Sequence, residues 1–211
     1  MPTPAADLMK RILIATSNPG KLRDFAAAAA PYGIDILPLA NFASLPPVVE
    51  DRTTFEANAR KKAEQYSLAV PGEVVIADDS GLEVDALGGA PGIHSARYAA
   101  DEPAKAESNT DDEANNARLM RETKNIPFEQ RTGRFVCVIA VACKGKTMAV
   151  FYGKAEGLIL DRPRGVNGFG YDPLFYFPEI HKTFAELSAE EKAKYSHRGA
   201  AFRKLLEGFL N

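Results

Sequence analysis

The sequence of 211 residues contains no tryptophan, only two cysteines and no long apolar run. Both cysteines, Cys137 and Cys143, lie in one apolar segment that is predicted to be a strand. Six residues of strand hold them roughly 20 Å apart, which is too far for a disulfide. We therefore expect two reduced, buried thiols in a cytoplasmic protein. No apolar run approaches the ~20 residues that a membrane span needs, so no membrane association is expected.

A surplus of charge of one sign is also absent. The chain has 26 Lys+Arg against 28 Asp+Glu, a formal net charge of −2. Proteins that coat nucleic acids depend on a surplus of cations facing the phosphates, so a nucleic-acid polymer is not an expected partner. The first residues lack the basic start and apolar core of a signal peptide. We expect a flexible leader over residues 1–9 and a single domain over residues 10–211.

What the sequence does contain is an alternation of strand and helix patterns that ends in a long hairpin. The predicted strands cover residues 11–15, 34–37, 74–77, 133–144 and 147–159. The predicted helices cover residues 19–32, 54–69 and 111–123 and the segment after Ser196. Thr53 and Glu56 match a capping box at the start of the second helix. This order of elements predicts an α/β protein with a mixed sheet.

The first candidate for chemistry is the segment Thr16-Ser17-Asn18-Pro19-Gly20-Lys21, between the first strand and the first helix. Asn18 suits the N-cap position, and Pro19 suits the first helical position. We expect free backbone N–H groups, the positive end of the helix and the Lys21 ammonium to favour a phosphate or a carboxylate. The spacing is not that of a Walker A loop. A well-capped helix with a solvated lysine is the alternative.

Carboxylates form the second candidate group. Asp78 and Asp79 follow a predicted strand, at the end where open α/β sheets bind ligands. If both stay in strand geometry they point to opposite faces, so that one faces a cleft while the other binds backbone or a neighbouring lysine. The aspartate in the cleft could hold Mg²⁺ or activate water. An ordinary turn over residues 78–81 is the alternative. Upstream, either Glu50 or Asp51 could complete a metal site.

Two later segments add aromatic and cationic side chains. Residues 163–173 carry three closely spaced glycines, which let a backbone approach a ligand, and Phe169, which could stack on a nucleobase. Ser196 as N-cap places His197 and Arg198 on the first helical turn, where cations call for a nearby anion or acceptor. The donors of Arg198 fit a carbonyl oxygen. The alternatives are an irregular loop pinned by aromatics and a surface arginine beside a half-buried histidine.

Together the segments resemble the inosine/xanthosine triphosphate pyrophosphatase family. The matching segments occur in the family's order, from Arg11 to Leu206, and are TSNPGK (16–21), TFEANA (54–59), ADDSGL (77–82), GGAPGIHSARY (88–98), GFGYDP (168–173) and SHR (196–198). The resemblance implies an elongated mixed β-sheet flanked by helices, two lobes with a central active-site cleft, and a homodimer. It also implies Mg²⁺-dependent hydrolysis of dITP, ITP, XTP or dXTP to the monophosphate and pyrophosphate, which would cleanse the nucleotide pool.

The resemblance also implies which residues bind the phosphates and the metal. Thr16, Asn18 and Lys21 would hold the phosphate chain. Glu50 and Asp79 would bind the metal, with Asp79 also the base for the attacking water. Ser17 stands where many relatives carry glycine, which could narrow the approach of backbone to phosphate.

The same resemblance implies how the base is read. Ser80 would contact the substrate, Phe169 would stack on the base with Gly170, Tyr171 and Asp172 around it, and Lys192 would reach the nucleotide. His197 and Arg198 would read the 6-oxo group, because the 6-amino group of adenine would leave their donors unpaired. Two other functions stay open: a nucleotide-binding sensor without turnover, and a related pyrophosphatase for other modified nucleotides.

Overall fold

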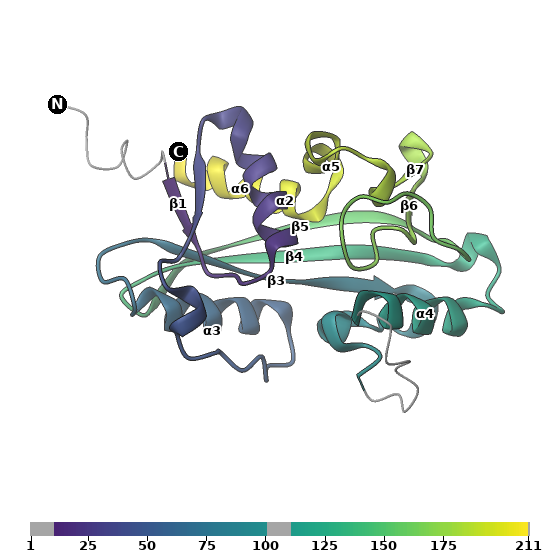
Figure 1. Ribbon diagram of the computed structural model, residues 1–211, viewed down its shortest axis with the longest axis horizontal. Coiled ribbons are helices and arrows are strands. Elements are labelled where there is room, and N and C mark those ends of the chain that lie inside the picture. The colour runs from purple at the N-terminus through teal and green to yellow at the C-terminus, as the bar shows by residue number, and fades with distance from the viewer. Residues whose placement is uncertain (1–10, 101–110, 211) are drawn as a thin grey trace. The chain divides into compact units, whose positions relative to one another are not determined.

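The computed structural model describes residues 11–100 and 111–210, so the leader predicted at residues 1–9 lies outside the described residues. Within the described residues, seven strands form one sheet in the order β2-β1-β3-β4-β5-β6-β7 (Figure 1). The strands are β1 (Arg11–Ile14), β2 (Asp35–Pro38), β3 (Val75–Val84), β4 (Thr132–Cys143), β5 (Lys146–Ile159), β6 (Phe175–Phe177) and β7 (Lys182–Thr183). β1 pairs in parallel with β2 and β3, whereas β6 pairs antiparallel with β5 and β7. The predicted mixed sheet is therefore confirmed.

Four of the five α-helices among the described residues match predicted helices, and the helix over residues 189–195 was not predicted. The five helices are α2 (Pro19–Ala29), α3 (Phe55–Ser67), α4 (Asp111–Thr123), α5 (Ala189–Tyr195) and α6 (His197–Leu210). Among residues 11–100 and 111–210, no helix has both the length and the apolar character that a membrane crossing requires.

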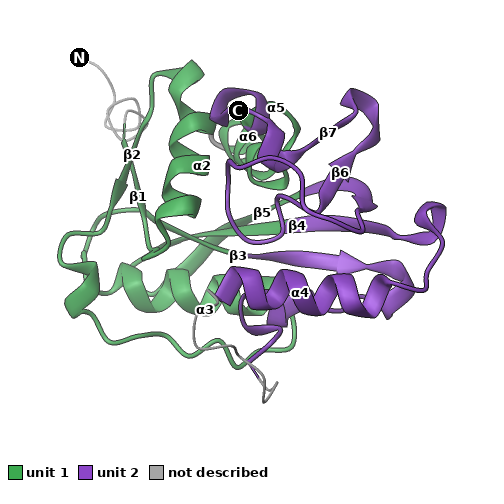
Figure 2. Ribbon diagram, turned by 45° about the vertical axis from the view of Figure 1, so that its right-hand side comes forward, with its two compact units in different colours: residues 1–79, 137–153, 193–211 green, residues 80–136, 154–192 purple. Residues whose placement is uncertain are grey.

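The chain divides into two compact units, drawn in different colours in Figure 2. Unit 1 comprises residues 1–79, 137–153 and 193–211. Here α2 and α6 cover one face of the strands and α3 covers the other (Figure 1). The core between the strands and α2 and α6 is built on fully buried side chains, among them Phe25, Ile76, Ile139 and Phe202. This packing fixes the ends of β1 and β3, on which the candidate residues of unit 1 lie.

Unit 2 comprises residues 80–136 and 154–192. Its core is aromatic, with the ring of Phe175 lying 4.8 Å from that of Phe135 and 5.0 Å from that of Phe184, centroid to centroid. Leu119 brings α4 into the same cluster. Rings at these separations pack favourably beyond their buried area. The cluster therefore gives the glycine-rich segment 163–173 a rigid base.

Three local predictions need correction. The N-cap of α3 is Thr54 and not Thr53, because Thr54 Oγ1 accepts a hydrogen bond from the Ala57 N–H at 3.1 Å. Residues 78–81 are not a turn, since β3 continues to Val84. The first helix is α-helical only to Ala29, and a 3₁₀ turn over Ala30–Tyr32 follows, because a proline at position 31 cannot donate to the helical ladder.

The two cysteines behave nearly as expected. Both lie in β4 and both are free, but only Cys137 is buried, whereas Cys143 is partly exposed at the end of the strand. Burial raises the pKa of the Cys137 thiol, which keeps it protonated and unreactive.

Candidate active site

The segment between β1 and α2 forms a capped helix start in unit 1. Asn18 Oδ1 accepts hydrogen bonds from the N–H groups of Gly20 at 2.8 Å and Lys21 at 3.0 Å, and the Asn18 N–H donates to Thr16 Oγ1 at 3.1 Å. The N-cap role of Asn18 and the place of Pro19 in the first turn are confirmed. The expectation of free N–H groups is wrong. Pro19 has no N–H, and the N–H groups of Gly20 and Lys21 both donate to Asn18 Oδ1. The Lys21 ammonium and the polar side chains before the helix, including the exposed Ser17, are the groups left to face an anion.

On one face of β3, Asp78 forms ion pairs with two cationic side chains. The Lys21 ammonium lies 3.0 Å from Asp78 Oδ2, and Arg198 Nε lies 3.8 Å from the same oxygen. Arg198 Nη1 also donates to Asp24 Oδ2 on α2, at 2.9 Å. Burial by itself would raise the pKa of Asp78, but Lys21, Arg198 and Lys62 outweigh it and lower that pKa from 3.8 to about 2. Asp78 is therefore a fixed negative charge that orients two cations.

Asp79 lies in a different setting. Its Oδ2 accepts a hydrogen bond from Asn58 Nδ2 at 3.0 Å, and Lys62 Nζ lies 3.5 Å from its Oδ1. Both partners come from α3, whereas the cations that hold Asp78 come from α2 and α6. Neighbouring side chains of a strand point to opposite faces, which is the arrangement predicted for these two aspartates.

The pKa of Asp79 is raised, in contrast to that of Asp78. Burial is the largest cause, and the neighbouring carboxylate of Glu50 adds to it, while Lys62, Lys21 and the Asn58 hydrogen bond act in the opposite direction. A carboxylate with a raised pKa accepts a proton more readily than one held at about 2.

Glu50 and Asp51 have different partners in the structure. Lys62 Nζ donates to Glu50 Oε1 at 2.6 Å, so Glu50 and Asp79 share one ammonium group. Asp51 is paired with Lys61 at 2.8 Å, and its side chain is 53% exposed. Glu50 is thus the carboxylate that accompanies Asp79, and Asp51 belongs to a surface ion pair.

Glu50 and Asp79 are the two carboxylates of this unit that could hold a divalent cation together. The part of the chain that the structure describes holds no group of three or more His, Cys, Asp or Glu side chains that could bind a metal. Mg²⁺ does not need such a cage, because it binds through one or two carboxylates together with waters and substrate phosphates. The Lys62 ammonium between the two carboxylates shows that this place already favours a positive charge.

His197 and Arg198 occupy the first turn of α6 and are buried, with 1% and 5% of their surface exposed. The alternative interpretation, in which Arg198 is a surface residue, is therefore wrong. Ser196 Oγ accepts from the Gly199 N–H at 3.1 Å, which confirms the predicted cap. Gly153 of β5 lets this turn approach closely, since a Cβ at position 153 would lie 2.0 Å from the His197 carbonyl oxygen.

The aromatic loop is the candidate site of unit 2. Asp172 Oδ2 accepts hydrogen bonds from the Phe169 N–H at 3.0 Å and from Lys192 Nζ at 2.5 Å. The Lys192 ammonium also lies 5.0 Å from the centroid of the Phe169 ring, a cation–π contact. Lys192 and Asp172 are buried, so three predicted residues form one tight group. A Cβ at Gly168 would lie 2.0 Å from Asp172 Oδ2, which explains the glycine.

The neighbours of Phe169 are anchored by residues outside the loop. The Tyr171 hydroxyl donates to the Ser95 carbonyl oxygen at 2.8 Å. The Gly170 N–H donates to Asp112 Oδ2 at 2.7 Å, and the Gly170 carbonyl accepts from Asn116 Nδ2 at 2.9 Å. Ser80 is half-buried on β3, where unit 2 begins.

Several residues of these networks were not found from the sequence. They are Asp24, Asn58, Lys62, Ser95, Asp112 and Asn116. Asn58 and Ser95 lie inside matched segments, and Lys62 follows Asn58 by four residues, which places both on one face of α3. That spacing was the available signal for Lys62, whereas nothing local marks Asp112 or Asn116.

Comparison with known proteins decides the family. A family model described as the Ham1 family matches residues 12–208. The chain belongs to the Ham1 family. It is 50% identical over 199 residues to the dITP/XTP pyrophosphatase of Geobacillus kaustophilus, covering 94% of each chain. It is 46% identical over 198 residues to the dITP/XTP pyrophosphatase of Bacillus subtilis, covering 94% of this chain and 96% of that one.

Solved Ham1 structures share the fold. The Ham1 protein of Staphylococcus aureus matches with a TM-score of 0.76 and 42% identity, over 95% of this chain and 98% of that one. A HAM1 protein from Coxiella burnetii matches with a TM-score of 0.78 and 34% identity, over 96% and 99%. The family resemblance carried by the six segments is thereby confirmed.

Proposed function

We propose that the chain hydrolyses dITP and XTP to the nucleoside monophosphate and pyrophosphate. The observation that carries this function is 50% identity, over 94% of both chains, to a dITP/XTP pyrophosphatase. The two groups of site residues, one in each unit, suit the parts of such a substrate. The residues of unit 1 suit the phosphates, a metal and the 6-oxo group of a purine, and the loop of unit 2 suits the face of a base.

The triphosphate would be held at the start of α2. The Lys21 ammonium supplies the positive charge, and Thr16, Ser17 and Asn18 supply polar groups beside it. Asp78 keeps the ammonium in place, because a buried carboxylate with its pKa lowered to about 2 stays ionised at neutral pH. Gly20, in the first turn of α2, is buried.

Glu50 and Asp79 would hold the metal, for which we propose Mg²⁺ because oxygen ligands and phosphates are its preferred partners. The bound ion would neutralise charge on the phosphates as the bond between the α- and β-phosphates breaks. Asp79 would take the proton of the attacking water. Asn58 orients the Asp79 carboxylate through its hydrogen bond at 3.0 Å, and Lys62 holds the two carboxylates together.

The base would be recognised by two sets of residues. Phe169 offers a ring for stacking, a contact worth about 1–3 kcal/mol per base, and the buried Lys192 and Asp172 hold that ring in place. His197 and Arg198 would donate to the 6-oxo group of the purine. A 6-amino group would leave buried donors without an acceptor, which is an expensive mismatch.

The test is a substrate panel. The protein is incubated with dITP, XTP, dATP, dGTP or dTTP and Mg²⁺, and pyrophosphate and orthophosphate are measured separately. We expect pyrophosphate from dITP and XTP. Binding without release would support the sensor, and equal release from dTTP would support the pyrophosphatase for other nucleotides.

Two variants, assayed with the same panel, test the assignment of Asp79 as the catalytic base. Asp79→Asn is expected to abolish turnover while dITP still binds. Asp78→Asn should instead weaken dITP binding, because Lys21 loses the carboxylate that orients it. Unchanged turnover in Asp79→Asn would refute the assignment.

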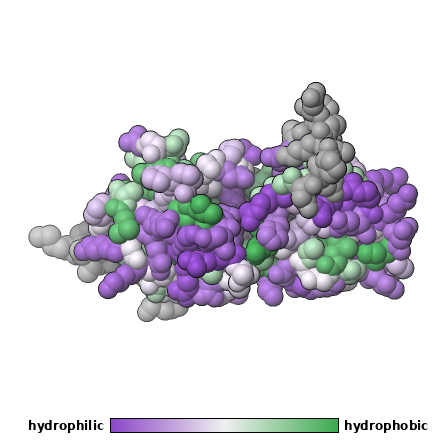
Figure 3. All heavy atoms as spheres, turned by 90° about the horizontal axis from the view of Figure 1, so that it is seen from below, coloured by the Kyte–Doolittle hydropathy of each residue, from purple (hydrophilic) through white to green (hydrophobic). Residues whose placement is uncertain are grey.

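The homodimer implied by the family resemblance stays a proposal. On the face of the molecule in Figure 3, hydrophilic residues dominate, and hydrophobic residues form small separate groups. Light scattering of the purified protein measures the oligomeric state directly.

A further inference from the structure

The backbone N–H and the carbonyl oxygen of Gly170 both form hydrogen bonds with side chains of α4. The N–H of Gly170 donates to Asp112 Oδ2 at 2.7 Å, and its carbonyl accepts from Asn116 Nδ2 at 2.9 Å. Gly170 follows Phe169 directly, and its φ of +60° is one that other residues rarely adopt. One glycine in an unusual conformation is thus held from both sides by a single helix.

We propose that Asp112 and Asn116 are positioning residues that set the orientation of Phe169 toward the purine base. The inference rests on the proposed function, because it concerns the ring proposed to stack on the base. Neither residue belongs to a matched segment, and neither would touch the substrate. They act through the Gly170 backbone.

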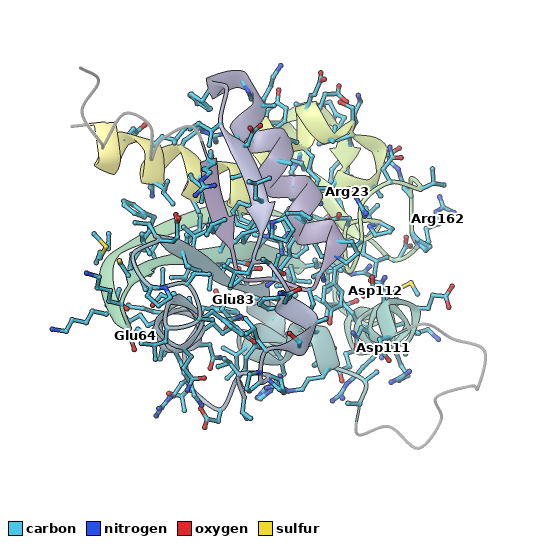
Figure 4. The ribbon with its side chains drawn as sticks, turned by 60° about the vertical axis from the view of Figure 1, so that its left-hand side comes forward. Arg23, Glu64, Glu83, Asp111, Asp112 and Arg162 are labelled. Atoms are coloured by element: carbon cyan, nitrogen blue, oxygen red, sulfur yellow. The ribbon has the colours of Figure 1, made fainter. Side chains whose placement is uncertain are left out.

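The helix is well suited to this role. Asp112 and Asn116 are four residues apart, so both side chains point from the same face of α4. Figure 4 labels Asp112 beside Asp111 in the first turn of the helix. A carboxylate at this position interacts favourably with the helix dipole. Leu119 packs α4 into the aromatic core of unit 2, so the two side chains rest on a rigid support.

The other contacts of this part of the loop lie on either side of Gly170, and the Lys192 ammonium also contacts the Phe169 ring. Asp172 holds the Phe169 N–H, and Ser95 holds the Tyr171 hydroxyl. The backbone dihedral angles of Gly170 lie between these two fixed points. A change there would rotate the ring relative to the rest of the loop. Stacking tolerates every base, but the ring position decides where the edge of the base lies. Misplacement by about 1 Å can lower catalysis by ~10²-fold.

The experiment uses substitutions of matched size in the full chain. Asn116→Asp keeps the shape but replaces the donor with a carboxylate that repels the Gly170 carbonyl. Asp112→Leu removes the acceptor, and Asp112→Asn keeps an acceptor oxygen at the same place. Glu113→Ala, at the next exposed position, is the control for losing an acidic residue from the first turn of α4.

We expect kcat/KM for dITP to fall by about fivefold or more in Asn116→Asp and in Asp112→Leu, which is the effect of one lost hydrogen bond. The loss should appear mainly in KM, and the preference for dITP over dATP should fall with it. Asp112→Asn and Glu113→Ala should stay within about twofold of the parent. A general loss of stability would lower the active fraction and kcat but would leave KM and the preference unchanged.

A fluorescence reporter separates this inference from the proposed function. The sequence has no tryptophan, so Phe169→Trp introduces a single indole at the proposed stacking position. Its emission is titrated with dIMP in the otherwise unchanged chain and in the Asn116→Asp background. We expect quenching in the first and weaker, less saturable quenching in the second.

Each outcome decides something. No response in the first chain, with dITP hydrolysis intact, would overturn the proposed stacking and this inference with it. Equal quenching in both backgrounds, or an unchanged KM and dITP preference in Asn116→Asp and Asp112→Leu, would overturn the inference alone. A defect in Asp112→Asn as large as in Asp112→Leu would show that the charge of Asp112, and not its bond to Gly170, matters.

Discussion

Lys62 is the side chain on which the two proposed metal-binding carboxylates depend, so its replacement by methionine is a demanding test. Its ammonium lies 2.6 Å from Glu50 and 3.5 Å from Asp79, and only 7% of the residue is exposed. Surrounding carboxylates raise the pKa of Lys62 although burial alone would lower it, so the ammonium stays charged. Lys62→Met preserves most of the side-chain volume and removes the charge.

The expected loss of stability in Lys62→Met follows from the distances between the Lys62 ammonium and the two carboxylates. At an effective dielectric constant of about 20, a unit charge 3.5 Å from Asp79 contributes about 5 kcal/mol of gross attraction. Desolvation of Lys62 offsets part of it, and Glu50 adds less because its side chain is 34% exposed. We expect the free energy of unfolding to fall by about 3 kcal/mol, since a buried carboxylate loses its partner. For a chain of this size that corresponds to a melting temperature roughly 6–12 °C lower.

The assay is thermal unfolding followed by circular dichroism at pH 7, with and without Mg²⁺. Lys61→Met is the matched control, because Lys61 pairs with the half-exposed Asp51 and a surface pair contributes only about 0–1 kcal/mol. Mg²⁺ should stabilise Lys62→Met more than the parent, since the ion replaces the missing charge between two carboxylates. Equal melting temperatures for the two variants, or no added effect of Mg²⁺ on Lys62→Met, would refute the reasoning.

Three further predictions concern other parts of the chain. Arg198→Ala should lower the ratio of dITP to dATP hydrolysis, a readout that does not depend on the folded fraction, and an unaltered ratio would show that the base is read elsewhere. Gly153→Ala should destabilise unit 1 by about 2–3 kcal/mol in denaturant unfolding, because the added Cβ meets the backbone of His197 at 2.0 Å; an unchanged midpoint would mean that β5 and α6 separate readily. Glu186 has a lowered pKa, chiefly from the backbone hydrogen bond of its capping box, so its stabilising effect is present above its usual pKa of 4.5 and lost as the pH falls through the lower folded value. Glu186→Gln keeps an acceptor for the Thr183 N–H but loses the charge that faces Arg164, so it should be less stable than the parent at pH 7 by about 0–1 kcal/mol. The two should converge as the pH falls below the folded-state pKa of Glu186 if the lowered pKa is the cause.

Features set by neighbouring residues could be predicted from the sequence. The cap at Asn18 and the opposite directions of Asp78 and Asp79 depend on a few adjacent residues, and both are confirmed. The capping threonine of α3 was misplaced by one position because Thr53 and Thr54 are adjacent and both suit the pattern. The structure selects Thr54, which lets Phe55 begin the helix as a buried residue.

Features set by distant residues could not be predicted. Arg198 binds Asp24 across 174 positions of sequence, and Asn116 binds Gly170 across 54. Nothing local to α4 or α2 indicates such partners. The short strands β6 and β7 were missed for a related reason, since their pairing with β5 and with each other depends on the aromatic core and not on any pattern of their own.

The opposite pKa shifts of two adjacent aspartates follow from their places on one strand. A strand sends consecutive side chains to opposite faces, and β3 lies between helices that differ in charge at this point. Burial would raise the pKa of Asp78, but Lys21 and Arg198 on the side of α2 and α6, with a smaller contribution from Lys62, outweigh it. On the side of α3, Lys62 is shared with Glu50, so burial prevails and the pKa of Asp79 rises. The pair Asp-Asp can therefore provide a permanent anchor for cations and a proton acceptor within two residues, and an exchange of roles would require moving Arg198 or Glu50 as well.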